Sequence, residues 1–376
     1  MREITISLTN YCNSNCEFCG YKKDIEKKSV SLFSAKAFLK MAKKIGYNSL
    51  IITGGGEPLI EIKKFMKLVA IAKRIGMEIR IVTNGYYGNL PIAHKITNYL
   101  KNNGVKKITF SIDYDHSKYI PIENSIKAIQ HAMNCDINVM IRMINRNKTY
   151  KKNMILLKKI SKMLDGIILR ISHSNFFIYS KKYRKFIHII MMGLARLPTY
   201  KNNIMKEMVP CDVQDLILHP CFGLVYSLDA NNIVLPCCQF IASNNPAVFG
   251  ISKITNKKNN ALEIKNEILK CILFDRMAFI KLYLAIRKNK KLGQEISKNK
   301  FYSQCHFCFW LLQNSKFIRK IQRISKMELA VLTIPIFHKL LIIRLKKLFY
   351  DKYFIFLTMV HRELNKLLAS VNNSHN

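Results

Sequence analysis

The chain has 376 residues, of which 49% are hydrophobic and 23% are charged. This composition excludes a wholly disordered chain and supplies enough apolar residues for a sizeable core. The charge is unusual, because 62 Lys and Arg against 23 Asp and Glu give a net charge of +39. No charge-free apolar run approaches the roughly 18 residues of a membrane-spanning helix.

The positive charge has several interpretations. Lys and Arg bind the phosphates of nucleic acids, anionic membrane surfaces and acidic proteins. A lysine-rich composition spread over a solvated surface also explains it, and we favour that interpretation. We find no nucleic-acid motif and no basic patch interleaved with aromatic residues. We therefore expect no specific nucleic-acid partner, whereas contact with a membrane surface stays open.

The segment from Met1 to Ile6 has a strand pattern with an acidic residue inside it, unlike a signal peptide. We therefore expect a cytoplasmic protein. In that compartment the 11 cysteines are expected to be thiols or metal ligands rather than disulfides.

From Met1 to about Ser172 the sequence alternates short β-branched runs with longer helical patterns. Gly46, Gly76 and Gly104 follow three of the helical patterns, where a C-cap glycine belongs. Strand–helix units at roughly 30-residue spacing predict an α/β fold with a parallel sheet, open or curled into a barrel. In such folds function sits at the C-terminal ends of the strands. The expected strands are Glu3–Leu8, Ser49–Ile52, Glu78–Val82, Lys107–Ile112, Asn138–Met143 and Gly166–Ile171. The expected helices are Ser34–Ile45, Ile60–Ile75, Ile92–Asn102, Ile122–Met133 and Asn153–Met163.

The most informative segment carries Cys12, Cys16 and Cys19 on one short loop after the first strand. Three thiolates can ligate three irons of a [4Fe–4S] cluster and leave the fourth iron open to a substrate. The alternatives are a zinc site and reduced structural thiols. Zinc would need a fourth nearby ligand, and none follows in the loop.

This cysteine spacing, with the aromatic Phe18 before the last cysteine, resembles that of the radical S-adenosylmethionine (SAM) superfamily. The resemblance covers at least Met1 to about Ser172, and it extends to the turn Thr53-Gly54-Gly55-Gly56-Glu57-Pro58 after the second strand. It implies a partial (β/α)6 barrel that uses a [4Fe–4S] cluster and SAM. By resemblance, the backbone of Gly54, Gly55 and Gly56 binds the amino group of the methionine moiety, and Glu57 helps to shape the turn.

Polar residues also end the later strands: Asn84 after the third, Ser111 and Asp113 after the fourth, and Arg142 at the fifth. The resemblance implies that they contact the cofactor or substrate, and Arg142 could pair with the SAM carboxylate. Each could also have an ordinary turn or surface role. Asp113, Asp115 and His116 form an acid–imidazole group at the same rim, in which His116 is either a proton donor or acceptor or a hydrogen-bonded loop histidine.

A second cysteine region follows between residues 211 and 310. A predicted β-hairpin with its turn at Ala230-Asn231-Asn232 brings the two cysteines that flank it together, and a second pair has the two-residue gap that suits chelation. The layout resembles the twitch and SPASM auxiliary-cluster modules, most closely the shorter twitch form. The resemblance implies a second [4Fe–4S] cluster, with zinc as the alternative, and Cys211 or Cys271 could replace one ligand. Cys135 is expected to be a free core thiol. The expected ligands are Cys221, Cys237, Cys305 and Cys308.

Cys238 is left over beside this expected cluster. Adjacent residues in a strand point to opposite faces, so Cys237 could ligate metal while Cys238 faces the substrate. The Pro236-Cys237-Cys238 sequence and the turn from Thr83 to Gly88 are similar to those of radical SAM peptide epimerases, which implies that Cys238 donates a hydrogen atom to a substrate radical. The alternatives are a buried structural thiol or an extra metal ligand.

These observations predict four regions: a radical SAM core (1–178), a helical connector (179–210), a twitch/SPASM-like Fe–S domain (211–310) and a basic amphipathic helical tail (311–376). The resemblance implies an enzyme that abstracts a substrate hydrogen with a 5′-deoxyadenosyl radical, in peptide modification that could be epimerisation. A dehydrogenase or cyclase acting on a small molecule is the second hypothesis. A non-catalytic, zinc-bearing protein that binds nucleic acid or a membrane surface is the third. An acidic flavodoxin or ferredoxin would be the electron donor.

Overall fold

The computed structural model describes residues 3–19, 26–53, 55–145, 148–171, 175–193, 227–235 and 252–253, together with residues 294, 296 and 298. The second-region cysteines and the predicted C-terminal tail lie outside them, as does the predicted connector beyond residue 193.

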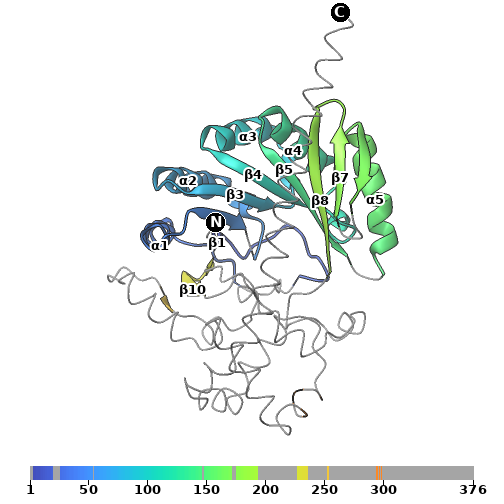
Figure 1. The fold of residues 1–376 in the computed structure, drawn as a ribbon. Helices are drawn as coiled ribbons and strands as arrows, with labels where there is room; N and C mark the ends of the chain where they lie inside the picture. The colour runs from blue at the N-terminus through green and yellow to red at the C-terminus, as the bar shows by residue number, and fades with distance from the viewer. Residues whose placement is uncertain are drawn as a thin grey trace, which may run out of the picture.

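Strands and helices alternate through the first part of the chain as predicted. The five α-helices lie along an outer arc around a fan of strands (Figure 1). The strands are β1 (Glu3–Ser7), β2 (Ser49–Thr53), β3 (Glu78–Thr83), β4 (Val105–Ser111), β5 (Asn138–Asn145), β6 (Gly166–Arg170), β7 (Asn175–Ser180), β8 (Lys185–Gly193), β9 (Ser227–Leu228), β10 (Ile233–Leu235) and β11 (Ser252–Lys253). The helices are α1 (Leu32–Lys44), α2 (Ile62–Arg74), α3 (Ala93–Asn102), α4 (Ile122–Asn134) and α5 (Tyr150–Met163), with 3₁₀ turns η1 (Pro58–Glu61), η2 (Tyr86–Asn89) and η3 (His116–Lys118).

The helix ends follow local sequence signals. The Ser31 side chain caps α1 by accepting a hydrogen bond from the Ser34 amide at 3.0 Å. The three glycines predicted to end helices, Gly46, Gly76 and Gly104, all have positive φ. That conformation favours glycine and stops each helix before the next strand.

The sheet has the order β11-β10-β9-β1-β2-β3-β4-β5-β8-β7-β6. Strands β1 to β5 are parallel and adjacent, so their carboxyl ends meet at one edge, where the predicted polar residues lie. The core lies between sheet and helices, where alternate strand residues such as Ile79 and Ile81 are fully buried. Each such side chain contributes about 1.5–3 kcal/mol to stability.

The sixth parallel strand differs from the prediction. Residues 166–170 do form a strand, β6, but it lies at the edge of the sheet, antiparallel to β7. The parallel neighbour of β5 is β8, in a segment that was predicted to be helical. In β8 the fully or nearly buried residues are Ile187, Ile189 and Met191, a period of two that belongs to a strand. The helical prediction was therefore wrong for residues 185–193, and the sheet continues beyond the predicted core boundary at residue 178.

The predicted hairpin around Ala230-Asn231-Asn232 is confirmed as β9 and β10, which are antiparallel. The Asp229 carboxylate accepts hydrogen bonds from the amides of Asn231 (2.9 Å) and Ile233 (2.8 Å), and Asn232 has a φ of +63°. Strand β9 pairs in parallel with β1, through Thr5 with Ser227 and Ile6 with Leu228. The hairpin thus extends the same sheet on the side of β1. Within the described residues, no helix is long and apolar enough to cross a membrane.

Candidate functional site

The three cysteines of the first loop follow β1 directly. Cys12 is half-buried, Cys16 is buried and Cys19 is exposed, and none of the three forms a disulfide. A tight turn brings the Cys19 amide to the Cys16 carbonyl oxygen at 3.0 Å. The Ser14 amide donates to the Cys12 sulfur at 3.4 Å. These two hydrogen bonds order the loop between Cys12 and Cys19.

Electrostatics favour a positively charged group at this loop. The pKa of Cys12 is raised to about 12, mainly by burial and also by the nearby Glu57, Cys19 and Cys16, against the opposing hydrogen bond from the Ser14 amide. Thiolates gathered here need a cation, and the irons of a cluster supply one. No three His, Cys, Asp or Glu side chains among the described residues are close enough to share a single metal ion. A [4Fe–4S] cube takes each thiolate on a different iron, so its ligands need not converge on one point, and the donor set fits it.

The glycine turn after β2 holds this loop in place. The Gly56 amide donates to the Thr9 carbonyl oxygen at 2.9 Å, and the Glu57 amide donates to that of Tyr11 at 2.8 Å. A Cβ atom on Gly56 would lie 1.9 Å from the Tyr11 carbonyl oxygen. Gly56 therefore permits backbone to approach backbone beside the cysteines. Gly55 is buried, and Gly54 lies outside the described residues.

Glu57 joins the ends of β2 and β3. Its carboxylate accepts hydrogen bonds from the amides of Leu59 (3.1 Å) and Asn84 (2.7 Å) and from the Thr83 hydroxyl (2.7 Å). Burial raises the pKa of Glu57 to about 7, although these hydrogen bonds act in the opposite direction. The predicted role in shaping the turn agrees with these contacts.

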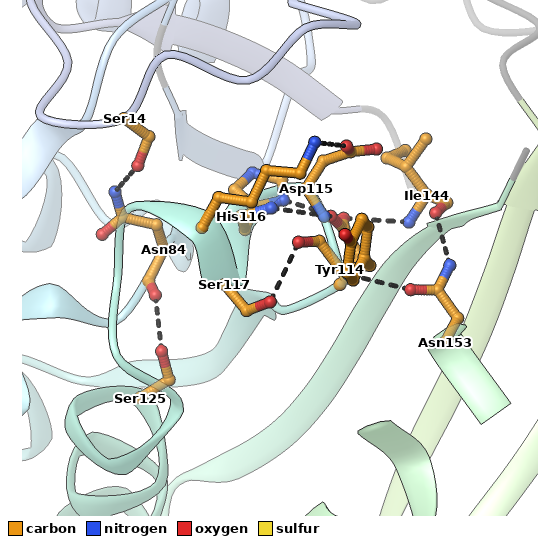
Figure 2. A network of polar contacts seen from close by, with 11 residues as sticks. Ser14, Asn84, Tyr114, Asp115, His116, Ser117, Ser125, Ile144 and Asn153 are labelled. Atoms are coloured by element: carbon orange, nitrogen blue, oxygen red, sulfur yellow. Dashed lines mark hydrogen bonds and ion pairs between the residues drawn. The ribbon is translucent and has the colours of Figure 1, made fainter. Parts of the chain in front are cut away.

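Asn84 reaches from the end of β3 to the cysteine loop. Its side-chain amide donates to Asn13 Oδ1 at 2.8 Å. The same amide donates to the Ser14 hydroxyl at 3.1 Å, and the backbone carbonyl oxygen of Asn84 accepts from the Ser125 hydroxyl at 2.9 Å (Figure 2). In this structure Asn84 thus positions residues between Cys12 and Cys16. Sequence reasoning missed Asn13 and Ser14, because nothing in their local pattern indicates a partner 70 residues away.

The acid–imidazole group after β4 is an ordered pair. His116 Nδ1 lies 2.7 Å from Oδ2 of Asp113, which is fully buried. Burial opposes ionisation of both groups, but their mutual attraction outweighs it. The pKa of Asp113 is therefore lowered, and the pKa of His116, which also contacts Cys16, is raised well above its ordinary value.

Two residues of η3 contact the cysteine loop. The His116 ring hydrogen-bonds to the Cys16 side chain and lies edge-on to the Phe18 ring, with 5.3 Å between centroids. Lys118 Nζ bridges Glu17 (2.9 Å) and Asp115 (3.1 Å). The sequence predicted that His116 lies at the edge of the sheet where the strands end, but its contact with the predicted ligand Cys16 follows only from the fold.

Ser111 and Arg142 occupy paired positions at the ends of β4 and β5. Both are half-buried, and the Ile112 amide donates to the Arg142 carbonyl oxygen at 3.1 Å. The pKa of Lys107 is lowered, first by burial and then by the charges of Arg80 and Arg142. Arg80 is itself paired with Glu3 and Glu78, and Glu3 acts on the pKa of Lys107 in the opposite direction, so these strands carry charges of both signs.

The remaining predicted site residues cannot be placed. Cys221, Cys237, Cys305 and Cys308, the predicted hydrogen donor Cys238, and the substitutes Cys211 and Cys271 all lie outside the described residues. Cys135, predicted to be a free core thiol, is free and half-buried, and its sulfur donates to Asn98 Oδ1 at 2.8 Å.

Comparison with known proteins matches the part of the chain that carries this site. Residues 6–171 match the Radical SAM superfamily. YydG from Bacillus subtilis, a peptide biosynthesis protein by name, is 22% identical over 328 residues, which cover 84% of this chain and 93% of YydG. The GTP 3′,8-cyclase of Alkaliphilus metalliredigens is 32% identical over 116 residues, which cover 29% of this chain and 34% of the cyclase. The solved structure of anSMEcpe with bound AdoMet and Kp18Cys peptide has a TM-score of 0.49 at 13% identity, covering 85% of this chain and 98% of that one.

Proposed function

Given that the chain carries a radical SAM domain over residues 6–171 and is a radical SAM enzyme, we propose that its substrate is a peptide. The observation that carries this proposal is the similarity to YydG, which extends over 84% of this chain and 93% of that peptide biosynthesis protein. The match extends over 328 residues, so the similarity is not confined to the radical SAM domain.

Radical SAM enzymes use a [4Fe–4S] cluster and SAM, which together supply a 5′-deoxyadenosyl radical that abstracts a hydrogen atom from the substrate. Cys12, Cys16 and Cys19 would hold the cluster. Asn84 and the turn of Gly56 and Glu57 keep their loop against the strand ends. Rigid support of this kind positions the reacting groups. Gly54, Gly55, Ser111, Asp113 and Arg142 stay predictions as cofactor contacts. Asp113 is the weakest of them, because its oxygens already accept hydrogen bonds within the chain.

The finer proposal is epimerisation of one residue of the peptide. Loss of the α-hydrogen leaves a carbon radical, and the Cys238 thiol would give it a hydrogen atom from the opposite face. The resulting thiyl radical would return to a thiol by taking up one electron and one proton. Cys221, Cys237, Cys305 and Cys308 would hold an auxiliary cluster that could supply that electron, since Cys237 adjoins Cys238 in the sequence. Zinc in its place could not supply an electron, because zinc has no redox chemistry.

A cyclase acting on a small molecule is the second candidate. The 32% identity to a GTP 3′,8-cyclase favours it, but that match covers only 29% of this chain. The two candidates differ in their products. A thiol-quenched peptide made in heavy water gains one solvent deuterium, whereas a cyclised small molecule is not a peptide product at all.

The test is anaerobic incubation of the reconstituted protein with SAM, dithionite and synthetic peptides in heavy water, followed by mass spectrometry. We expect 5′-deoxyadenosine and a peptide that gains one mass unit at a single residue. Cys16→Ala should form no 5′-deoxyadenosine, and Cys135→Ala, at a cysteine outside the loop, should form as much as the wild type. Cys238→Ala should yield no peptide that carries solvent deuterium at an inverted α-carbon. Conversion of GTP with no peptide modified would reject the peptide proposal.

The electron donor is a separate part of the proposal. A net charge of +39 would attract an acidic flavodoxin or ferredoxin, and such attraction weakens as salt screens the charges. We expect the rate of cluster reduction by a flavodoxin to fall steeply between low and high ionic strength, measured by stopped-flow absorbance. A salt-independent rate would count against this partner.

A further inference from the structure

The loop after β4 is built around one buried carboxylate. Asp113 Oδ1 accepts hydrogen bonds from the amides of Asp115 and His116, both at 2.9 Å. Its other oxygen faces His116 Nδ1 at 2.7 Å and accepts from the Ile144 amide at 3.1 Å. Asp113 is 0% exposed. Four contacts satisfy a carboxylate, so Asp113 acts on its surroundings through the imidazole that it orients.

A second buried residue makes this loop rigid. Asn153, at the start of α5, accepts a hydrogen bond from the Tyr114 amide and donates one to the Ile144 carbonyl oxygen, both at 2.8 Å (Figure 2). The Ser117 hydroxyl donates to the Tyr114 carbonyl oxygen at 2.9 Å in the same loop, but this bond involves neither the Asp113 carboxylate nor the His116 ring. The His116 ring is therefore held from the strand ends and from α5.

The imidazole ring of His116 lies beside the cysteine loop, where it contacts Phe18 and Cys16. Since Nδ1 faces Asp113, Nε2 is the ring nitrogen left to donate to Cys16, the cysteine that the ring contacts. The edge contact with the Phe18 ring holds the imidazole beside that loop. A carboxylate behind a histidine in this way sets the tautomer and the direction of its N–H.

We propose that the Asp113–His116 pair is a positioning pair, in which Nε2–H of His116 donates a hydrogen bond to the Cys16 sulfur and thereby raises the reduction potential of the cluster. This rests on the cysteine loop being the cluster site of the proposed function. A hydrogen bond to a ligating sulfur withdraws electron density from the iron, so the cluster accepts its one electron from an external low-potential donor more readily.

Two polar variants separate the proposed bond from mere packing. In His116→Asn the side-chain amide can take the place of Nδ1 beside Asp113 but is too short to reach Cys16. In His116→Gln the amide can take the place of Nε2 and still donate to the sulfur. We expect the midpoint potential, measured by an EPR-monitored redox titration without SAM, to shift to more negative values in His116→Asn and to stay near the wild-type value in His116→Gln.

Ser117→Ala is the matched control, because it removes a hydrogen bond within the same loop without touching the cysteines; its potential should equal that of the wild type. Equal potentials in the wild type and His116→Asn, or equal shifts in the Asn and Gln variants, would overturn the proposal. Iron uptake by the Gln variant but not by the Asn variant would support it.

A measurement on the unaltered protein guards against variants that fail to fold. The reduced cluster of protein labelled with ¹⁵N-histidine should show a weak nitrogen coupling in pulsed EPR, and its absence would overturn the proposal. Absence of any cluster from the wild type would instead reject the proposed function, so the two failures are distinguishable.

Discussion

Gly56 is the position where the smallest change would disturb the site most. Its missing side chain lets the turn after β2 pack against the backbone of Tyr11, next to Cys12. A Cβ atom at position 56 would collide with backbone atoms of Tyr11, which cannot move aside as the end of a flexible side chain can. The glycine turn therefore controls where the cysteine loop begins.

Gly56→Ala should lower the free energy of unfolding by about 3 kcal/mol, the upper end of the usual cost of overpacking, and should reduce iron uptake. Gly104→Asn is a suitable control, since no atom lies within 4 Å of its Cβ position and asparagine tolerates its positive φ. Chemical denaturation of the iron-free protein measures the first effect, and iron analysis measures the second. If the Gly56→Ala protein were destabilised but kept its iron content, the glycine turn would not be needed for iron binding by the cysteine loop.

Glu57 makes the stability of the iron-free protein depend on pH. The folded protein holds the Glu57 proton up to a pKa of about 7, whereas the unfolded chain releases it near the ordinary value of 4.5. The folded state therefore binds more protons between these values, and stability falls as pH rises from 4.5 to 7, by about 3 kcal/mol. Glu57→Gln, which cannot ionise, should lack this component. The free energy of unfolding is measured by denaturation at pH 5 and pH 7 in both proteins. An equal change between the two pH values in the wild type and in Glu57→Gln would contradict this role of Glu57.

The β9–β10 hairpin is the element whose position matters most beyond the core. It pairs with β1, the strand that leads into the cysteine loop, and the Ser31 amide donates to Asn232 Oδ1 at 2.9 Å. Cys221 and Cys237, which flank the hairpin in the sequence, are two of the four predicted ligands of the auxiliary cluster. Attachment to β1 supports the proposal that the auxiliary site belongs to the same catalytic unit.

Asp229→Ala should loosen this hairpin, because the Asp229 carboxylate organises its turn through the amides of Asn231 and Ile233. We expect a loss of about 2 kcal/mol in local stability, seen as faster amide hydrogen exchange in residues 227–235. Asp229→Asn retains an oxygen in the same place and should exchange close to the wild-type rate. Equal exchange in the alanine variant and the wild type would mean that the turn does not depend on this carboxylate.

The β7–β8 pair shows where local pattern is insufficient. The segment after Tyr179 is apolar and basic, which suits an amphipathic helix as well as a strand. Its identity as a strand follows from pairing with β5 through residues such as Ile141 and Ile189, far apart in sequence. Long-range pairing of this kind overrides intrinsic propensity.

The extent of the whole sheet predicts where the folded core ends. A chain of residues 1–178 would leave the β5 edge uncovered, whereas residues 1–193 retain β8 against it. Both lack the β9–β10 hairpin, so they form a matched pair. We expect 1–193 to unfold cooperatively and 1–178 to aggregate, as exposed strand edges do, in thermal unfolding and size-exclusion chromatography. If the two proteins unfolded and eluted alike, the core boundary predicted at residue 178 would be supported instead.

The features that could be predicted are local ones. The spacing of Cys12, Cys16 and Cys19, the glycine turn, the first five strands and the turn at residues 230–232 all depend on neighbouring residues, so periodicity and turn chemistry reveal them. Asn84 meets Asn13 across 71 positions, and Lys118 meets Glu17 across 101. The contact of His116 with Cys16, the pairing of β9 with β1 and the position of β8 beside β5 also join residues that are distant in the sequence. The loop contacts form because parallel strands bring their carboxyl ends to one edge, and the strand pairings form because the sheet brings separate segments together. No local sequence pattern shows which distant segments will meet.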